Sequence, residues 1–455
     1  MKLDEIKSLL DKVGEEYIED LKDFLRQPSI SARGEGVDAC ASMLREFMEK
    51  AGFRVEVWRM KDANPVVYGE LYSSSSKTIL LYGHYDVQPP EPLEEWSSPP
   101  FEAVESNGKI TARGAADSKS NVMAIVKAVE SYSKLGLAPS VNIKVLFEGE
   151  EEIGSPNLSR YVEAYKDRLK ADAAICFDGG LDPKGRPELW LGLKGMLYVE
   201  LRCRTARVDA HSSLAPLIEN AAWRLIQALN TLRSPDGSIL IDGWYDDVRV
   251  PTEDDLKLLE EVDYETLLAG LKSHFNLDKF LCGVERVEAV KKLLFQPTCN
   301  IAGINAGYTG PGVKTVLPRD AYVKIDFRLV YDQNPYKLLE NLKKHLKAKG
   351  FEDIEVKALN FLEPSKTPPS APIVRAVSIA ASEVYQSKPQ IYPNSPGSGP
   401  DYLFTKRLGL NSVWTGCAPP LSNAHAPNEY TTRDAFLKGI LFVSSIMENY
   451  GCIEY

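Results

Sequence analysis

The sequence predicts an α/β protein with a mixed, largely parallel sheet and an inserted α+β domain. Short apolar runs that are typical of buried strands alternate with helical segments through the first part of the chain, which favours a parallel sheet. Near Leu193 the pattern changes to alternating strands and amphipathic helices, and the α/β pattern returns only after Pro372. A chain of 455 residues is also long enough for two or three domains.

The first part of the chain is expected to begin with helices. Apolar residues recur at helical spacing from Leu3 to Leu25, and a second helix is expected at 37–51. Residues 53–60 alternate like a strand, and the serine run at 73–76 is typical of an exposed hairpin turn. Three apolar runs then predict buried strands, with a helix between the first two; the strands are expected at 78–87, 140–149 and 171–180, and the helix at 121–136.

The inserted part is expected to contain two strands and two helices. They fall at 195–206, 219–234, 323–330 and 334–350. A stretch rich in proline and serine ends this part at 362–372, before a helix at 373–386 and an apolar run at 411–416. We therefore predict one domain made of residues 1–195 and 363–455, with an inserted domain at 196–362.

Composition narrows the class of protein. Hydrophobic residues make up 44% and charged residues 26%, as in ordinary globular proteins. The net charge of −10 argues against a nucleic-acid partner, because phosphate contacts need a basic face. No apolar run approaches the roughly 20 residues of a spanning helix, and the charged N-terminal segment does not resemble a signal peptide. The seven cysteines form no Cys-x-x-Cys pair, so we expect a reducing, cytoplasmic location and no membrane partner.

Polar residues follow the predicted buried strands, where ligand sites of α/β sheets are found. They are His84 and Asp86 after the first strand, Asp117 before a helix, Asp178 after the third strand, and His425 in a late loop. Histidines and carboxylates that converge from strand ends suit divalent transition metals. Each residue also has an ordinary explanation: a packed histidine, a helix cap at Asp117, or a turn at Asp178.

The second strand ends in a crowded acidic stretch, "VLFEGEEEIGS", at 145–155. Like charges repel, and removing a carboxylate from water is costly. Two divalent ions about 3.5–4 Å apart, sharing a bridging carboxylate, would compensate these charges. The alternative is a solvated turn without a role.

These segments resemble the motifs of the M20 metallopeptidases, and most closely the cytosolic non-specific dipeptidase and carnosinase branch. The matching segments are "GHYDVQP", "ARGAADSKSN", "FEGEEEIGS", "KTVLPRDAYVKIDFRLV" and "NAHAPNE", and the resemblance covers nearly the whole chain. It implies a phosphorylase/hydrolase-like catalytic domain and an inserted lid and dimerisation domain.

The resemblance also implies a metal site with two divalent ions per subunit. His84 and Asp178 would hold one ion, Glu152 and His425 the other, and Asp117 would bridge them. Zinc is the first choice, and manganese or cobalt also suits such ligands.

Further roles follow from the same resemblance. Glu151 would move a proton from the attacking water to the leaving amine, and Asp86 would orient the imidazole of His84. Glu148 and Glu150 receive no catalytic role, and structural hydrogen bonding is expected for both.

Contacts to the substrate are implied as well. His211 resembles a histidine that reaches the active site of the partner subunit in a homodimer and stabilises the oxyanion. Thr315, Arg328 and Ser398 resemble substrate contacts, with Arg328 holding a substrate carboxylate. Without the resemblance, His211 would be an ordinary loop histidine and Arg328 an exposed strand residue.

The sequence departs from the family pattern in several places. The loop after Asp117 reads Ser-Lys-Ser, and "NSPGSGPDY" puts Ser395 near an expected glutamate, so substrate preference could differ. His274 and His345 match no motif and are expected on the surface of the inserted domain. We predict a hydrolase that cleaves a peptide bond next to a free carboxylate; an N-acyl amino acid deacylase and a non-catalytic binding protein are the alternatives.

Overall fold

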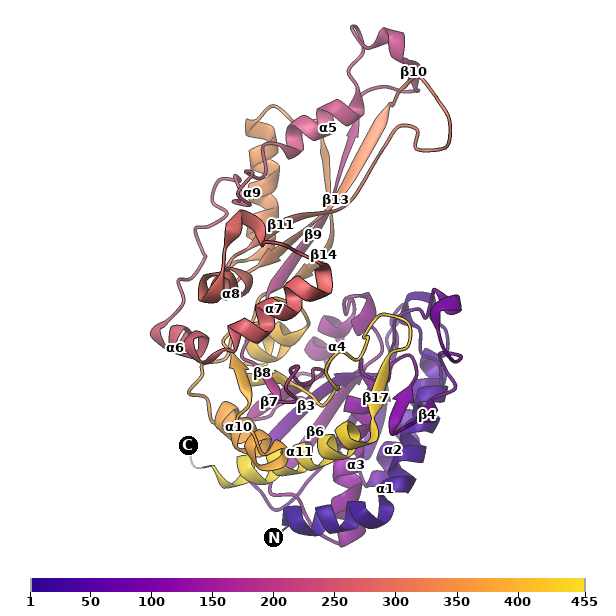
Figure 1. The fold of residues 1–455 in the computed structure, drawn as a ribbon, viewed down its shortest axis with the longest axis vertical. Helices are drawn as coiled ribbons and strands as arrows, with labels where there is room; N and C mark the ends of the chain where they lie inside the picture. The colour runs from indigo at the N-terminus through magenta and orange to yellow at the C-terminus, as the bar shows by residue number, and fades with distance from the viewer. Residues whose placement is uncertain (1, 454–455) are drawn as a thin grey trace.

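The computed structural model describes residues 2–453, which form two units (Figure 1). The lower unit contains both ends of the described chain and is built around an eight-stranded sheet. The upper unit is built around a four-stranded sheet. The predicted α/β class with an inserted α+β part is confirmed.

The eight-stranded sheet has the order β1-β2-β6-β3-β7-β16-β8-β15. Its centre, β6-β3-β7-β16, is parallel, whereas β1 and β2 add antiparallel strands at one edge. The strands are β1 Arg54–Trp58, β2 Val66–Leu71, β3 Thr78–His84, β6 Asn142–Glu148, β7 Ala173–Phe177, β8 Glu188–Trp190, β15 Gln390–Tyr392 and β16 Asn411–Thr415.

Both faces of this sheet are covered, which explains why its strands are continuous apolar runs. In β3, Ile79 and Leu81 pack into the core formed with the N- and C-terminal helices, while Leu80 and Tyr82 enter the core on the opposite face. The helices of the first core are α1 Lys2–Arg26, α2 Val37–Ala51, α3 Lys119–Leu135, α10 Pro372–Tyr385 and α11 Arg433–Cys452; α4 Leu158–Ala164 lies on the opposite face.

The smaller sheet has the order β11-β13-β9-β14, and all its neighbours are antiparallel. Its strands are β9 Gly195–Arg204, β11 Thr298–Ala306, β13 Asp320–Leu329 and β14 Glu355–Leu362, and the helices α5 Ala221–Leu229 and α9 Pro335–Ala348 pack against it. A second helical group, α6 Glu253–Glu261, α7 Tyr264–Phe275 and α8 Arg286–Phe295, shares a small core with Tyr392 of β15.

Two short sheets complete the fold. β10 Ala210–His211 pairs with β12 Val316–Leu317 at the end of the upper unit that is farthest from the lower one (Figure 1). The other short sheet consists of β4 Val104–Ser106, β5 Lys109–Thr111 and β17 Tyr430–Thr432. Among residues 2–453, every helix is too short or too polar to span a bilayer.

The structure corrects two sequence predictions. The serine run at 73–76 does not form a hairpin, because β2 and β3 lie on opposite sides of β6. His345 is buried and not on the surface, and its Nε2 lies 3.1 Å from the hydroxyl oxygen of Thr231. His274 is exposed, as expected. Both errors have the same physical cause, because local periodicity does not encode which distant segments pair or pack. The domain limits at 195 and 362 stay a prediction.

Candidate metal centre

The predicted polar residues meet at one edge of the large sheet. β3 ends at His84 and is parallel to both β6 and β7, so the carboxyl ends of the three strands lie together. A short 3₁₀ turn carries Glu151 and Glu152 just past β6, and Asp178 follows β7 directly. The fold therefore brings strand ends from separate parts of the sequence to one place.

Two groups of ligand-type side chains form at this edge. In the first, Nε2 of His84 lies 3.0 Å from Oδ1 of Asp117 and 3.2 Å from Oδ1 of Asp178. In the second, Nε2 of His425 lies 2.9 Å from Oδ2 of Asp117 and 3.1 Å from Oε2 of Glu152. In each group the ligand atoms lie within 4.8 Å of one another, and Asp117 offers a different oxygen to each.

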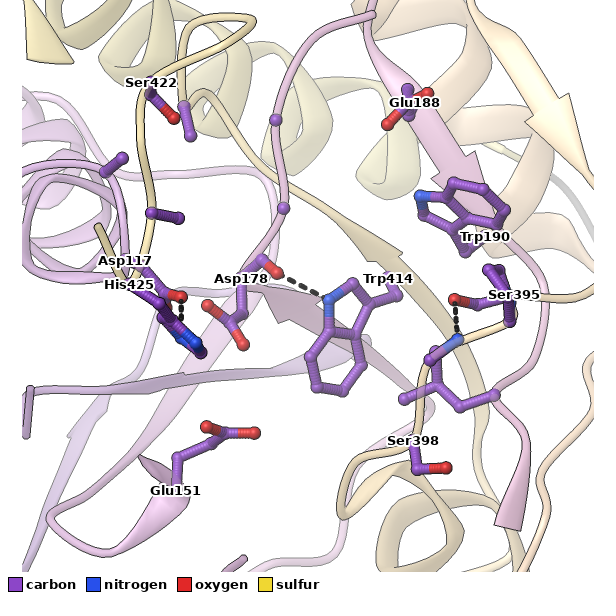
Figure 2. A pocket seen from close by; sticks show the side chains of 18 residues that line it. Asp117, Glu151, Asp178, Glu188, Trp190, Ser395, Ser398, Trp414, Ser422 and His425 are labelled. Atoms are coloured by element: carbon purple, nitrogen blue, oxygen red, sulfur yellow. Dashed lines mark hydrogen bonds and ion pairs between the residues drawn. The ribbon is translucent and has the colours of Figure 1, made fainter. Parts of the chain in front are cut away.

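Asp117 is thus not a helix cap. The residue that caps α3 is Ser118, and its side chain makes no capping hydrogen bond. The carboxylate of Asp117 points to the two imidazoles instead; Figure 2 shows it beside His425.

The protonation of these groups reflects the crowding of acids. Burial would raise the pKa of Asp117, but hydrogen bonds with His425 and His84 lower it well below its usual range. Hydrogen bonds to Asp117 and Glu152 raise the pKa of His425 to about 11. Burial would lower the pKa of His84, but the charge of Asp178 and hydrogen bonds with the carboxylates raise it. Without a metal ion, protonated imidazoles would therefore compensate these acids.

The residues fit divalent metal ions. Oε1 of Glu152 is buried without a hydrogen-bond partner, although the Nε2 of Gln88 donates to Oε2 at 2.9 Å. Imidazole and carboxylate are the donors that zinc, manganese and cobalt accept. No lysine or arginine of residues 2–453 forms an ion pair with Asp117, Glu152 or Asp178, so the protons of the two imidazoles are the only compensating charge that a metal ion would have to replace.

Asp86 contacts more of the centre than the sequence predicted. Nδ1 of His84 lies 3.1 Å from the backbone oxygen of Asp86 and 3.4 Å from its carboxylate. That carboxylate also accepts hydrogen bonds from the backbone N–H groups of Glu151, at 3.1 Å, and Glu152, at 3.0 Å. Asp86 therefore holds the first imidazole mainly through its backbone oxygen, and its buried carboxylate holds the turn that carries the acid pair.

The four glutamates of the acidic stretch differ in their surroundings. Glu148 accepts hydrogen bonds from the hydroxyls of Tyr82 and Ser155, and burial raises its pKa to about 8. Glu150 accepts hydrogen bonds from the backbone of Asn64 and the amide of Asn157, so both residues have structural surroundings as expected. The Glu151 carboxylate lines a cavity together with Asp178 and His425 (Figure 2). Burial raises the pKa of Glu151 well above its usual value.

One organising residue, Glu429, was not predicted. It is fully buried and accepts hydrogen bonds from the backbone N–H groups of Gly114, Ala116 and Asp117, besides pairing with Arg113 at 2.7 Å. It thereby shapes the loop that presents Asp117. Its position four residues after His425, inside a motif segment, was the available signal.

The predicted substrate contacts fall in two places. Arg328 and Ser398 line a cavity of about 200 Å³ together with Glu151, Glu152 and His425. His211 is exposed in β10 at the far end of the upper unit, with its Nε2 3.3 Å from the hydroxyl of Thr315. Within one chain, therefore, His211 and Thr315 do not join the other site residues.

A second cavity of about 410 Å³ adjoins the first. It shares Glu151, Ser398 and His425 with the smaller cavity and extends past Asp178 toward Trp190 and Glu188. The candidate metal ligands thus stand between a small cavity that contains an arginine and a larger one with an aromatic wall.

An α/β sheet with two histidine–carboxylate groups at its carboxyl edge is the architecture of a metal-dependent hydrolase. A family model described as peptidase family M20/M25/M40 matches residues 80–449. The chain therefore belongs to this family and is a metallopeptidase, as its motifs indicated.

Individual relatives support this membership. The chain is 42% identical to the M20 family metallo-carboxypeptidase Sso-CP2 from Sulfolobus solfataricus, with a TM-score of 0.91 over 96% of this chain and 100% of that one. It is 28% identical over 474 residues to the Cys-Gly metallodipeptidase dug1 of Schizosaccharomyces pombe, covering 98% of each chain. It is 32% identical over 288 residues to human Beta-Ala-His dipeptidase, covering 62% of this chain and 56% of that protein.

Proposed function

We propose that this metallopeptidase uses two divalent ions to cleave the peptide bond next to a free C-terminal carboxylate, in dipeptides or short peptides. The observation that carries the proposal is Arg328 in the small cavity beside Glu151 and the candidate ligands. A guanidinium there can hold a carboxylate by two parallel hydrogen bonds. The named activities of the relatives, a carboxypeptidase and dipeptidases, support the same reaction.

The roles proposed for the ligands follow the two groups of side chains. His84 and Asp178 would hold one ion, Glu152 and His425 the other, and Asp117 both. Bound there, the ions would lower the pKa of the attacking water and polarise the scissile carbonyl.

The remaining roles belong to side chains that do not bind metal. Glu151 would accept the proton of the attacking water and pass it to the leaving amine, since it lines both cavities and has no side-chain hydrogen bond within residues 2–453. Asp86 would keep the imidazole of His84 and the backbone of Glu151 in place. Arg328 and Ser398 would bind the carboxylate end of the substrate.

A homodimer would supply the missing contact. His211 and Thr315 lie far from the centre of their own chain, so His211 of the partner subunit is proposed to stabilise the oxyanion. Sedimentation velocity tests this assembly: a fully active monomer would remove the role in trans.

Two further proposals concern the metal and the location of the protein. We propose zinc as the first choice of metal, and we propose a cytoplasmic location.

The test of the reaction is a substrate panel. Metal-loaded protein should hydrolyse dipeptides and release C-terminal residues from short peptides, but it should not act on the same peptides with an amidated C-terminus. Arg328→Met should raise KM for the free acids strongly. N-acyl amino acids belong in the panel, because the larger cavity has an aromatic wall that could receive an acyl group. Hydrolysis of neither class would overturn the proposed function.

A further inference from the structure

The larger cavity ends at an acidic residue to which no motif assigns a role. Glu188 and Trp190 lie two residues apart in β8, so their side chains share one face of the strand. Both line the cavity that begins at Asp117 and Asp178, and in Figure 2 they lie on the side away from His425.

An aromatic wall connects the metal ligands to Glu188. The indole N–H of Trp414 donates to the backbone oxygen of Asp178 at 2.6 Å, and Trp414 is the strand partner of Trp190. Trp190 in turn stacks on Tyr392, with ring centroids 3.9 Å apart and planes at 10°. Trp414 and Trp190 therefore both line the cavity between Asp178 and Glu188.

The charge of this cavity is one-sided. Its charged lining residues are Asp117, Glu151, Asp178 and Glu188, beside His425, and no lysine or arginine of the described chain lines it. Metal ions would compensate Asp117 and Asp178, whereas Glu188 lies at the other end.

Arg186, whose charge acts on Glu188, already forms ion pairs with other carboxylates. Arg186 pairs with Asp182 at 2.5 Å and with Asp263 at 3.2 Å. Tyr392 donates a hydrogen bond to Glu188, which leaves the carboxylate able to accept more. Glu188 thus lacks a cation of its own within reach of a direct ion pair in the described part of the chain.

We propose that this cavity binds a lysine or arginine side chain on the amino side of the cleaved bond, with Glu188 accepting its charge. The inference rests on the proposed function, because Arg328 must hold the C-terminal carboxylate for the amino side to enter the larger cavity. A long aliphatic stem fits along Trp414 and Trp190, where the cationic group also gains from the indole face. The α-amino group of a dipeptide lies too close to the scissile carbonyl to use such a wall.

Matched substrates test this without any variant. Lysyl-alanine and norleucyl-alanine have the same stem and differ in the ammonium group. We expect kcat/KM to favour lysyl-alanine by about tenfold or more, the effect of one hydrogen bond to a charged group. The preference should persist when both α-amino groups are acetylated. Equal values for the two dipeptides would overturn the inference, and so would a preference that disappears on acetylation, because the preference would then depend on the free α-amine and not on the side chain alone.

Variants assign the preference to Glu188. Glu188→Gln should bring the ratio of the two kcat/KM values close to one, and Glu188→Lys should favour glutamyl-alanine over lysyl-alanine. Glu163→Gln, an exposed glutamate on α4, is the control and should keep the ratio of the unmodified protein. An unchanged ratio in Glu188→Gln would overturn the inference. Its failure differs from failure of the proposed function, in which no dipeptide is hydrolysed at all.

Discussion

Two groups of acidic side chains in this protein have similarly spaced carboxylates but differ in the cations that lie beside them. At the sheet edge, Asp117 and its neighbours bring ligand atoms within 4.8 Å of one another, and Glu16, Asp20 and Glu130 do the same between α1 and α3. Geometry alone would rank both as metal sites. What separates them is the cation that stands beside the carboxylates.

The helical group carries its own cations. Lys127 lies 2.5 Å from both Asp20 and Glu130, and Lys50 and Lys134 pair with Glu16 at 3.2 and 2.8 Å. The group at the sheet edge has only imidazoles, which can give up their protons to bind metal. We therefore expect metal ions at the group on the sheet edge and none at the helical group, whose lysines already compensate its carboxylates.

The largest effect is expected from Glu151→Gln. Loss of the proton acceptor should lower kcat by about 10²–10⁴-fold, while the metal content stays at that of the unmodified protein, because Glu151 bonds to neither imidazole. Steady-state kinetics and metal analysis of one preparation measure both quantities. Glu163→Gln is the control. Normal turnover would remove Glu151 as the base, and loss of metal would make it a ligand.

Changes to the candidate metal ligands and to the residues that support them should have the next largest effects. Glu429→Gln should weaken metal binding by about 10–100-fold, because the loop that carries Asp117 loses charged hydrogen-bond acceptors. Glu152→Gln should weaken it further, since a proposed ligand loses its charge. Competition with a chelator measures both. If both substitutions left the metal affinity unchanged, the sheet-edge group would not hold the ions.

Glu130→Gln tests the other side of the comparison. Metal content and kcat should not change, whereas the free energy of unfolding of the metal-free protein should fall by about 1–3 kcal/mol, because buried Lys127 loses one of its two carboxylate partners. Urea denaturation measures the loss. Glu49→Gln, which breaks an exposed pair with Arg45, should have a much smaller effect. Loss of metal in Glu130→Gln would contradict the distinction between the two groups.

Elements whose burial is marked locally in the sequence, as a periodic apolar helix face or a continuous apolar strand, could be predicted well. The helix expected at 37–51 is found as Val37–Ala51, and the three predicted buried strands all form. Because the carboxyl ends of parallel strands lie at one sheet edge, the polar residues after the predicted strands were expected to converge. The pairing of His84 with Asp178 was implied only by the resemblance to the family.

Contacts between distant segments could not be predicted in this way. Glu429 supports the loop of Asp117 across more than 300 residues of sequence, and the lysines beside Glu130 come partly from other helices. Glu188 precedes an apolar dipeptide in a three-residue strand, too short for any periodic signal. Such relations depend on packing of the whole chain, which local pattern does not encode.

Glu188 is a third kind of acid in this comparison, because its cation would be part of the substrate. The pH dependence of its substrate preference is the smallest effect that we expect. Burial and the charge of Asp182 raise its pKa to about 7, against the opposing hydrogen bond from Tyr392 and the charge of Arg186. The carboxylate is therefore mostly neutral below that pH and mostly ionised above it. The preference for lysyl-alanine over norleucyl-alanine should rise several-fold from about pH 6 to about pH 8, while the lysine side chain stays charged throughout. Groups common to both reactions, such as Glu151, cancel in this ratio. In Glu188→Gln the ratio should not vary with pH, and a ratio in the unmodified protein that falls or stays constant would contradict the role of this carboxylate.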